Sequence, residues 1–214
     1  KNLSDFNEMS SGGKIISLDA ENLLLTIGDF WQKNISQDLS KEYGKILKIN
    51  KNNFVSKIYS FGHRNPQGII KANENIYSTE HGPRGGDEIN HIIENNNYGW
   101  PLVSEGNHYN GTHIPSHSTN KKFTPPVKYW VPTIAPSSLA FMPIEKGNRW
   151  SGNAFISGLK SKAIFRLEIK NNQIINEEKF YLGKRIRALT ISHDMTLWLI
   201  EDGGIGRLLK IRLM

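Results

Sequence analysis

The chain has 214 residues, and 37% of them are hydrophobic, which is enough for a folded globular protein with a substantial core. It contains no cysteine, which excludes a disulfide framework and thiolate chemistry. The net charge of +7 comes from scattered residues without a basic run or an aromatic-basic signature, so we expect no nucleic-acid partner. No apolar run approaches the ~18 residues of a membrane span, and the N-terminus lacks the apolar region of a signal peptide.

A two-part unit recurs along the chain. In each copy an apolar run leads into an acidic or glycine-containing turn, and a second run alternates apolar with basic residues, as in KILKI at 45–49. Alternation with a period of two predicts strands. Between the two runs of the first copy, residues 36–44 have the serine start and glycine stop of a short helix. In chain order the copies are residues 23–50, 76–93, 154–169 and 197–213.

Four similar units at this spacing predict an all-β fold of the β-propeller type, with blades around a central channel. At roughly 40 to 50 residues per blade, the chain would supply four to five blades. A β-sandwich also joins short strands by turns, but the similarity of the units favours the propeller. We expect residues 1–214 to form a single domain, with an insertion in the third unit at about 102–128. A loop of that length is usually functional or mobile.

Two glycine-containing segments predict the chemistry. GHRNPQG (62–68) and STEHGPRGGDEIN (78–90), with NYGWP (97–101) behind them, bring together an Arg-Asn pair, a Gly-Pro loop and an Asp-Glu pair. Guanidinium groups bind carboxylates in a bidentate manner, and calcium accepts oxygen ligands that include backbone carbonyls. Either segment alone would be typical of a turn between strands. Together they indicate a site for a polyanionic organic molecule and a hard metal ion.

These segments resemble the soluble pyrroloquinoline quinone (PQQ)-dependent glucose and aldose dehydrogenases, also called the glucose/sorbosone dehydrogenase family. The resemblance runs from about residue 12 to residue 211. It implies a six-bladed propeller with PQQ over the channel and calcium beside it. Because family members begin earlier, it also implies that roughly the first one to two blades are missing here. The other segments that carry the resemblance, in the family's order, are TIGD (26–29), GKILKIN (44–50), WVPTIAPSS (130–138), SGLK (157–160) and KRIR (184–187).

The resemblance implies a set of site residues. Arg64 would lie close to the reacting carbonyl of the quinone, and the carbonyls of Gly82 and Pro83 would bind the calcium beside it. Glu88 and Tyr98 would bind a second, structural calcium. A cationic site suits PQQ because burying its three carboxylates requires compensating charge. The other cofactor contacts would come from Asn65, His81, Thr133, Lys160, Arg185 and Arg187, and the two arginines of KRIR, two apart on a strand, would face the same way.

The chain departs from the family at the catalytic base. Relatives remove the hydroxyl proton of the sugar with a histidine, which is oriented by the aspartate of TIGD. Here Ser10 stands at the position of the base, while Asp29 keeps that of the orienting carboxylate. A serine hydroxyl is too weak a base at neutral pH. Three explanations stay open: PQQ is bound but sugars are oxidised poorly, Asp29 or His81 serves as the base, or the ligand platform persists without the chemistry.

These observations lead us to expect an oxidoreductase that oxidises aldose sugars with PQQ and calcium and passes electrons to an external acceptor, with activity impaired by Ser10. The alternative is a non-catalytic, calcium-stabilised binding propeller of the same family. A six-bladed lactonase has no motif in its support. By analogy with the family, the protein would act in the periplasm or outside the cell. We expect His108, His113 and His117 in the long loop to be surface residues, and His63 to be a packing or turn residue.

Overall fold

The computed structural model describes residues 9–212, and this part of the chain contains strands and two short 3-10 helices but no α-helix. The helices are η2 (Lys33–Gln37) and η3 (His117–Thr119). The strands are β1 (Gly12–Ser17), β2 (Asn22–Ile27), β3 (Lys45–Asn50), β4 (Ser56–Phe61), β5 (Pro66–Ala72), β6 (Asn75–Glu80), β7 (Asp87–His91), β8 (Lys128–Trp130), β9 (Pro136–Phe141), β10 (Ala154–Gly158), β11 (Ala163–Lys170), β12 (Gln173–Tyr181), β13 (Ile186–Ile191), β14 (Leu197–Glu201) and β15 (Leu208–Ile211).

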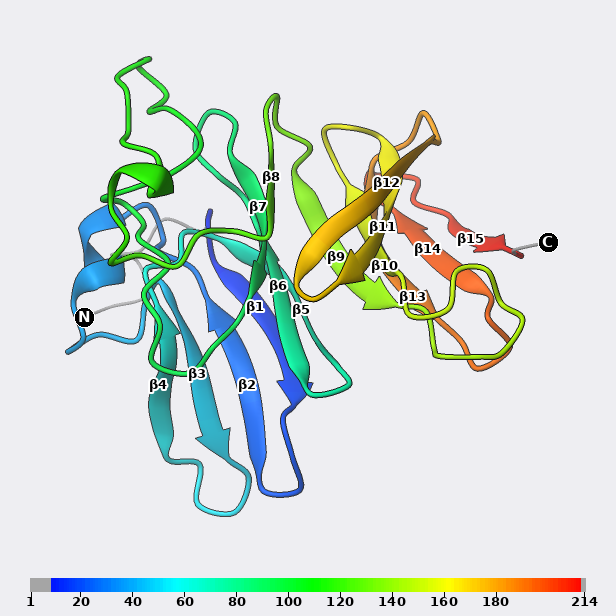
Figure 1. Cartoon of the computed structure of the whole chain (residues 1–214), viewed down its shortest axis with the longest axis horizontal. Coiled ribbons are helices and arrows are strands. Elements are labelled where there is room, and N and C mark those ends of the chain that lie inside the picture. The colour runs from blue at the N-terminus through cyan, green and yellow to red at the C-terminus, as the bar shows by residue number, and fades with distance from the viewer. Residues whose placement is uncertain (1–8, 213–214) are drawn as a thin grey trace.

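The strands form four antiparallel sheets that follow one another in chain order (Figure 1). Three sheets have four strands each, β1 to β4, β5 to β8 and β9 to β12, and the fourth contains β13, β14 and β15. Within each sheet, neighbours in sequence are neighbours in space. The first strands of successive sheets also contact one another, β1 with β5, β5 with β9 and β9 with β13. This is how blades surround the channel of a propeller, and the all-β prediction is confirmed.

The repeated units correspond to the second and third strands of each sheet. They contain the hairpins β2–β3, β6–β7, β10–β11 and β14–β15, so the predicted strand pairs are confirmed. The prediction that the long insertion belongs to the third unit was wrong. It lies between β7 and β8 and therefore inside the second sheet, because the short strand β8 returns after the loop and pairs with β7.

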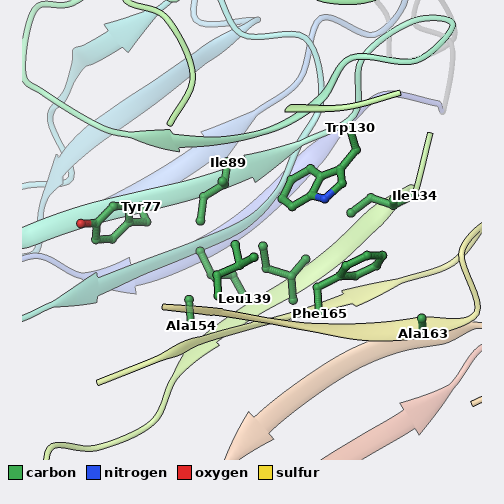
Figure 2. Close-up of a cluster of buried hydrophobic side chains, with 10 residues drawn as sticks. Tyr77, Ile89, Trp130, Ile134, Leu139, Ala154, Ala163 and Phe165 are labelled. Atoms are coloured by element: carbon green, nitrogen blue, oxygen red, sulfur yellow. The ribbon is translucent and has the colours of Figure 1, made fainter. Parts of the chain in front are cut away.

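The hydrophobic core lies between successive sheets. Figure 2 shows the cluster that joins the second sheet to the third, in which Trp130 of β8 packs near Phe165 of β11 with ring centroids 5.9 Å apart. Ile89 of β7 is completely buried in the same cluster. Strands with apolar side chains on both faces fit this position, since the second and third sheets are each covered by a neighbour on either side. Packing between sheets therefore fixes the strand ends that carry the candidate site.

The helix predicted at residues 36–44 is wrong. Only η2 is helical there, and turns continue to Gly44. The ammonium group of Lys45, which is completely buried, accounts for the difference. Its Nζ donates hydrogen bonds to the carbonyls of Ile35 (2.9 Å), Ser36 (3.0 Å) and Tyr43 (2.7 Å). The carbonyls of Ser36 and Tyr43 therefore turn toward this cation instead of along a helix axis, whereas the Ile35 carbonyl also accepts the Asp38 amide at the end of η2 (3.1 Å).

Candidate functional site

The candidate site lies where the first strand of each sheet begins. Short links join β4 to β5, β8 to β9 and β12 to β13, at residues 62–65, 131–135 and 182–185. Because each link returns the chain to the end where the preceding sheet began, all first strands start at the same end of the channel. Cross-links between sheets agree with this: the Gly12 amide donates to Asn65 Oδ1 (3.2 Å) and Ser137 Oγ to the Ile186 carbonyl (2.6 Å).

Arg64 is buried at the centre of this end, with 8% of its surface exposed. Its Nη1 donates hydrogen bonds to the carbonyls of Gly82 (2.9 Å) and His81 (3.2 Å). The guanidinium carbon lies 5.5 Å from the ring centroid of Trp100 and 5.8 Å from that of Tyr109, and such contacts attract a cation. The turn at 81–82 thus directs backbone carbonyls toward a positive charge, as a calcium ligand would require.

Asp87 fixes that turn. The side chain is buried, and Oδ1 accepts a hydrogen bond from the Gly82 amide (3.0 Å). Oδ2 accepts from the amides of Ile134 and Ala135, both at 2.7 Å, and from the Thr133 hydroxyl. One carboxylate therefore joins the Gly-Pro turn of the second sheet to the link before β9. The sequence marked the Asp-Glu pair, but we assigned no role to its aspartate.

His63 and Glu80 form a buried pair that holds the backbone of Arg64 in place. His63 Nδ1 lies 3.1 Å from Glu80 Oε1, while Glu80 Oε2 accepts the Arg64 amide at 2.9 Å. Burial alone would raise the pKa of Glu80, but the charge and hydrogen bond of His63, together with the Arg64 amide, outweigh it and lower the pKa. Glu80 is therefore a carboxylate that holds the backbone of Arg64. The prediction that His63 is a packing residue is confirmed, since it is completely buried.

Glu88 is a buried carboxyl group that has little hydrogen bonding to offset the cost of its burial. Its Oε2 accepts one long hydrogen bond, from Asn90 at 3.3 Å. Burial raises the pKa of Glu88 well above its ordinary value, and the nearby charge of Glu80 raises it further. Glu88 and Tyr98 both line a small hollow of about 10 Å³. A carboxyl group in this state suits a bound cation, although no three His, Asp or Glu side chains converge on a metal position within residues 9–212.

His117 approaches the same hollow, and the prediction of a surface position was wrong for it. The side chain is buried, with Nδ1 3.0 Å from Glu105 Oε1 and Nε2 3.0 Å from the Tyr98 carbonyl. The long loop folds back over NYGWP, and this places η3 against the loop's own beginning. By contrast, His113 is exposed and His108 is partly exposed.

The remaining cations belong to the third and fourth sheets, Lys160 in the turn between β10 and β11, Arg185 in the link before β13 and Arg187 in β13 itself. Lys160 is exposed, and its amide donates to the Ile134 carbonyl (3.1 Å), which places it beside the segment of Thr133. Arg185 Nε and Arg187 Nε both bond to the carboxylate of Asp202, at 2.7 and 3.0 Å. The expectation that these arginines face the same way is confirmed, but Asp202, which the sequence did not single out, offsets part of their charge.

His81 lies within the field of two of these cations. Burial lowers the pKa of its imidazole, and the charges of Arg64 and Arg187 lower it further. Nε2 donates to the Pro136 carbonyl at 2.7 Å, which leaves Nδ1 as the acceptor nitrogen of a neutral ring.

Ser10 and Asp29 lie together at the edge of the site. The Ser10 hydroxyl (3.2 Å) and the Asp29 amide (2.8 Å) both donate to the Arg64 carbonyl. The carboxylate of Asp29 is buried and accepts from Trp100 Nε1 (2.8 Å) and from the Trp31 amide (2.9 Å). The position expected for a base is therefore adjacent to the position expected for its orienting carboxylate, as the resemblance implies.

Comparison with known proteins assigns the chain to a family. Residues 4–210 match the family model described as Glucose / Sorbosone dehydrogenase. The chain belongs to this family. Aldose sugar dehydrogenase YliI of Escherichia coli is 32% identical over 219 residues, which cover 94% of this chain and 59% of the relative. This chain thus spans less than two thirds of its relative's length.

Solved structures of the family have the same fold. The soluble aldose sugar dehydrogenase (Asd) from Escherichia coli, in its apo-form, is 33% identical with a TM-score of 0.84, over 93% of this chain and 63% of that chain. The PQQ-bound form of aldose sugar dehydrogenase (Adh) from Streptomyces coelicolor is 26% identical with a TM-score of 0.72, over 94% of this chain and 61% of that chain. Within residues 9–212, no helix has the length and apolar character needed to cross a membrane.

Proposed function

We propose that this chain is the greater part of a PQQ- and calcium-dependent aldose dehydrogenase, in which a six-bladed propeller holds the cofactor over its channel. The observation that carries the proposal is the buried Arg64, whose guanidinium donates to the carbonyls of Gly82 and His81, and the charge of Arg187 acts with it in lowering the pKa of that histidine. An organic anion needs such converging cations, and a hard metal ion needs such carbonyls. Membership of the glucose/sorbosone dehydrogenase family supports the same reading.

Each residue would have a defined task. Lys160, Arg185 and Arg187 would bind the carboxylates of PQQ, with Asn65, His81 and Thr133 as polar contacts, and the carbonyls of Gly82 and Pro83 would bind the calcium. When bound, PQQ would supply the acceptor for the hydride of the sugar, and calcium would supply a Lewis acid beside the quinone. Arg64 would lie against the reacting carbonyl and hold the developing negative charge. Electrons would leave to an external acceptor, and we place the protein in the periplasm or outside the cell by family analogy.

The proton of the sugar hydroxyl requires a base, and two groups of this chain are candidates. Asp29 is ionisable and adjacent to Ser10, although both its oxygens already accept hydrogen bonds. His81 is a neutral imidazole whose Nδ1 has its lone pair available. The serine at the family's base position favours a second candidate function, a calcium-stabilised binding propeller without turnover.

Reconstitution tests the proposal. The apoprotein, with its upstream sequence, is titrated with PQQ in the presence of Ca²⁺, followed by absorbance, and dye reduction is then measured with glucose and other aldoses. Arg187→Ala should weaken PQQ binding about tenfold, since a charge-assisted hydrogen bond contributes about 1.4 kcal/mol or more. The matched control is Arg149→Ala, an exposed arginine in the 142–153 loop at the opposite end of the sheets. No absorbance change and no turnover would refute the function, and equal losses in both variants would refute the assignment of Arg187.

Glu88 yields a prediction about stability. The pKa of Glu88 in the folded state lies well above 4.5, the ordinary value that applies to the unfolded chain. At a pH between the unfolded-state and folded-state pKa, the folded protein therefore holds a proton that the unfolded chain has lost. The metal-free protein should therefore lose stability as pH rises through that interval. Glu88→Gln should flatten this dependence and abolish the rise in Tm that Ca²⁺ produces by binding the native state. Thermal unfolding from about pH 5 to about pH 8, with EDTA or Ca²⁺, measures both.

The control for this experiment is Glu145→Gln, which neutralises an exposed carboxylate outside the hollow. It should leave both the pH dependence and the calcium response as in the wild type. A calcium response that survives in Glu88→Gln would show that the stabilising ion binds elsewhere.

A further inference from the structure

Two exposed aromatic side chains lie beside the buried Arg64. Trp31, in the turn after β2, and Tyr109, in the long loop, stack with ring centroids 5.7 Å apart and planes within 5° of parallel. Half of the surface of Trp31 (50%) and more than half of that of Tyr109 (58%) remains exposed. Large aromatic rings are rarely left open to solvent side by side, so their pairing here marks a surface that a ligand would cover.

The backbone holds Trp31 in this position at a conformational cost. Phe30 and Trp31 both have positive φ angles, 48° and 63°, which non-glycine residues seldom adopt. The carboxylate of Asp29 stabilises the turn by accepting the Trp31 amide at 2.9 Å. Consecutive strained residues persist where surrounding structure fixes them, and such positions cluster at ligand sites. The turn therefore presents the indole outward rather than into the core.

Polar groups lie at the base of the same surface. Trp31 and Tyr109 line an open hollow of about 100 Å³ that also contains Asp29, Arg64 and Trp100. Arg64 Nη2 donates to the Tyr109 hydroxyl at 3.2 Å, so the long loop is tied directly to the centre of the site. Each oxygen of the Asp29 carboxylate accepts one hydrogen bond and retains a lone pair for a second. An apolar wall with a few convergent polar groups is typical of a small-ligand pocket.

We propose that Trp31 and Tyr109 form the sugar-binding wall of this protein, against which one pyranose ring places its C–H face. The oxidation of the bound sugar rests on the proposed function, whereas the binding of the sugar does not. A pyranose has an apolar face of axial C–H groups and a rim of hydroxyls, which match the aromatic pair and the Asp29–Arg64 base. A hollow of about 100 Å³ is small, which favours a single ring over an extended chain such as a peptide. The pocket thus selects cyclic sugars over open-chain polyols.

Saturation-transfer NMR tests this binding directly. D-glucose is titrated into the protein with and without PQQ and Ca²⁺, and sorbitol serves as the acyclic comparison. We expect saturation to be strongest at the axial H1, H3 and H5 protons of β-glucose and weak for sorbitol. Trp31→Asn, which removes the ring with a residue suited to a positive φ, should raise the half-saturating glucose concentration about tenfold or more, while Trp31→Phe should restore most of the affinity.

Tyr109→Ala should have a similar effect, and Tyr181→Ala, which removes an exposed tyrosine of β12, should have none. PQQ affinity, measured by absorbance, should be unchanged in the Trp31 variants. If the wild type binds glucose and these variants do not, but no form of the protein binds PQQ, the sugar-binding wall is supported and the dehydrogenase function is refuted. If PQQ binds and is reduced but the glucose dependence is the same in Trp31→Asn and wild type, the pocket is overturned and the function stands.

Discussion

Replacing Ser10 with histidine is expected to raise the rate of sugar-dependent dye reduction by about 10²-fold or more, since a positioned general base contributes about 10²–10⁴. Ser10 is buried beside Asp29, and their hydroxyl and amide share the Arg64 carbonyl as acceptor. The φ angle of 63° at Ser10 is one that histidine adopts more readily than most residues. An imidazole there would lie next to the carboxylate that can orient it. The rate is measured with saturating PQQ and Ca²⁺.

The gain should follow the titration of the new side chain. Only the neutral imidazole accepts a proton, so the rate should rise as pH passes through about 6.5 and then level off. Ser10→Asn is the control, because asparagine is polar, suits the same backbone angle and cannot act as a base. Equal rates in the two variants would place the base elsewhere. A silent Ser10→His protein that still binds PQQ would favour the binding propeller.

Asp87→Ala should destabilise the fold by about 4 kcal/mol and weaken PQQ binding as well, since the amides of Gly82, Ile134 and Ala135, of which that of Ile134 is buried, each lose their acceptor. The carboxylate connects two sheets, so its loss should loosen the turn that carries the proposed calcium carbonyls. Urea unfolding measures the first effect, and absorbance titration with PQQ measures the second.

Two variants sharpen this test. Asp87→Asn keeps one carbonyl oxygen and should lose less stability than the alanine variant. Asp194→Ala removes an exposed aspartate that also accepts a backbone amide, that of Thr196 at 3.3 Å, and it should cost much less stability than Asp87→Ala. If Asp87→Ala unfolds like Asp194→Ala, the carboxylate does not hold the two sheets together.

The second and third strands of each sheet could be predicted from the sequence, because the two-part unit recurs four times and runs such as KILKI of β3 place basic residues among apolar ones. The first strands were missed. β5 contains a proline and a glycine and contacts the first and third sheets on its two sides, and β13 lacks a strict alternation. The helix at 36–44 failed for a different reason: the carbonyls of Ser36 and Tyr43 turn toward the ammonium group of Lys45.

The candidate site was predictable where single residues carry a motif, as for Arg64 and the Gly-Pro turn. It was not predictable where the contact spans distant segments. Asp87 bonds to amides 47 and 48 residues further along the chain, and no local pattern encodes that reach. Trp31 and Tyr109 were missed for the same reason, because one belongs to a turn and the other to a loop whose return path was unknown.

The brevity of the links before the first strands has a consequence for how this protein can vary. A residue added to or removed from residues 62–65 would displace Arg64 by roughly one strand step, about 3.3 Å, which exceeds any tolerance of a hydrogen bond. The hairpin turns at the far end of the sheets carry no such demand. Changes in length should therefore accumulate in those turns, while the links before the first strands stay constant in length and evolve by exchanging side chains alone.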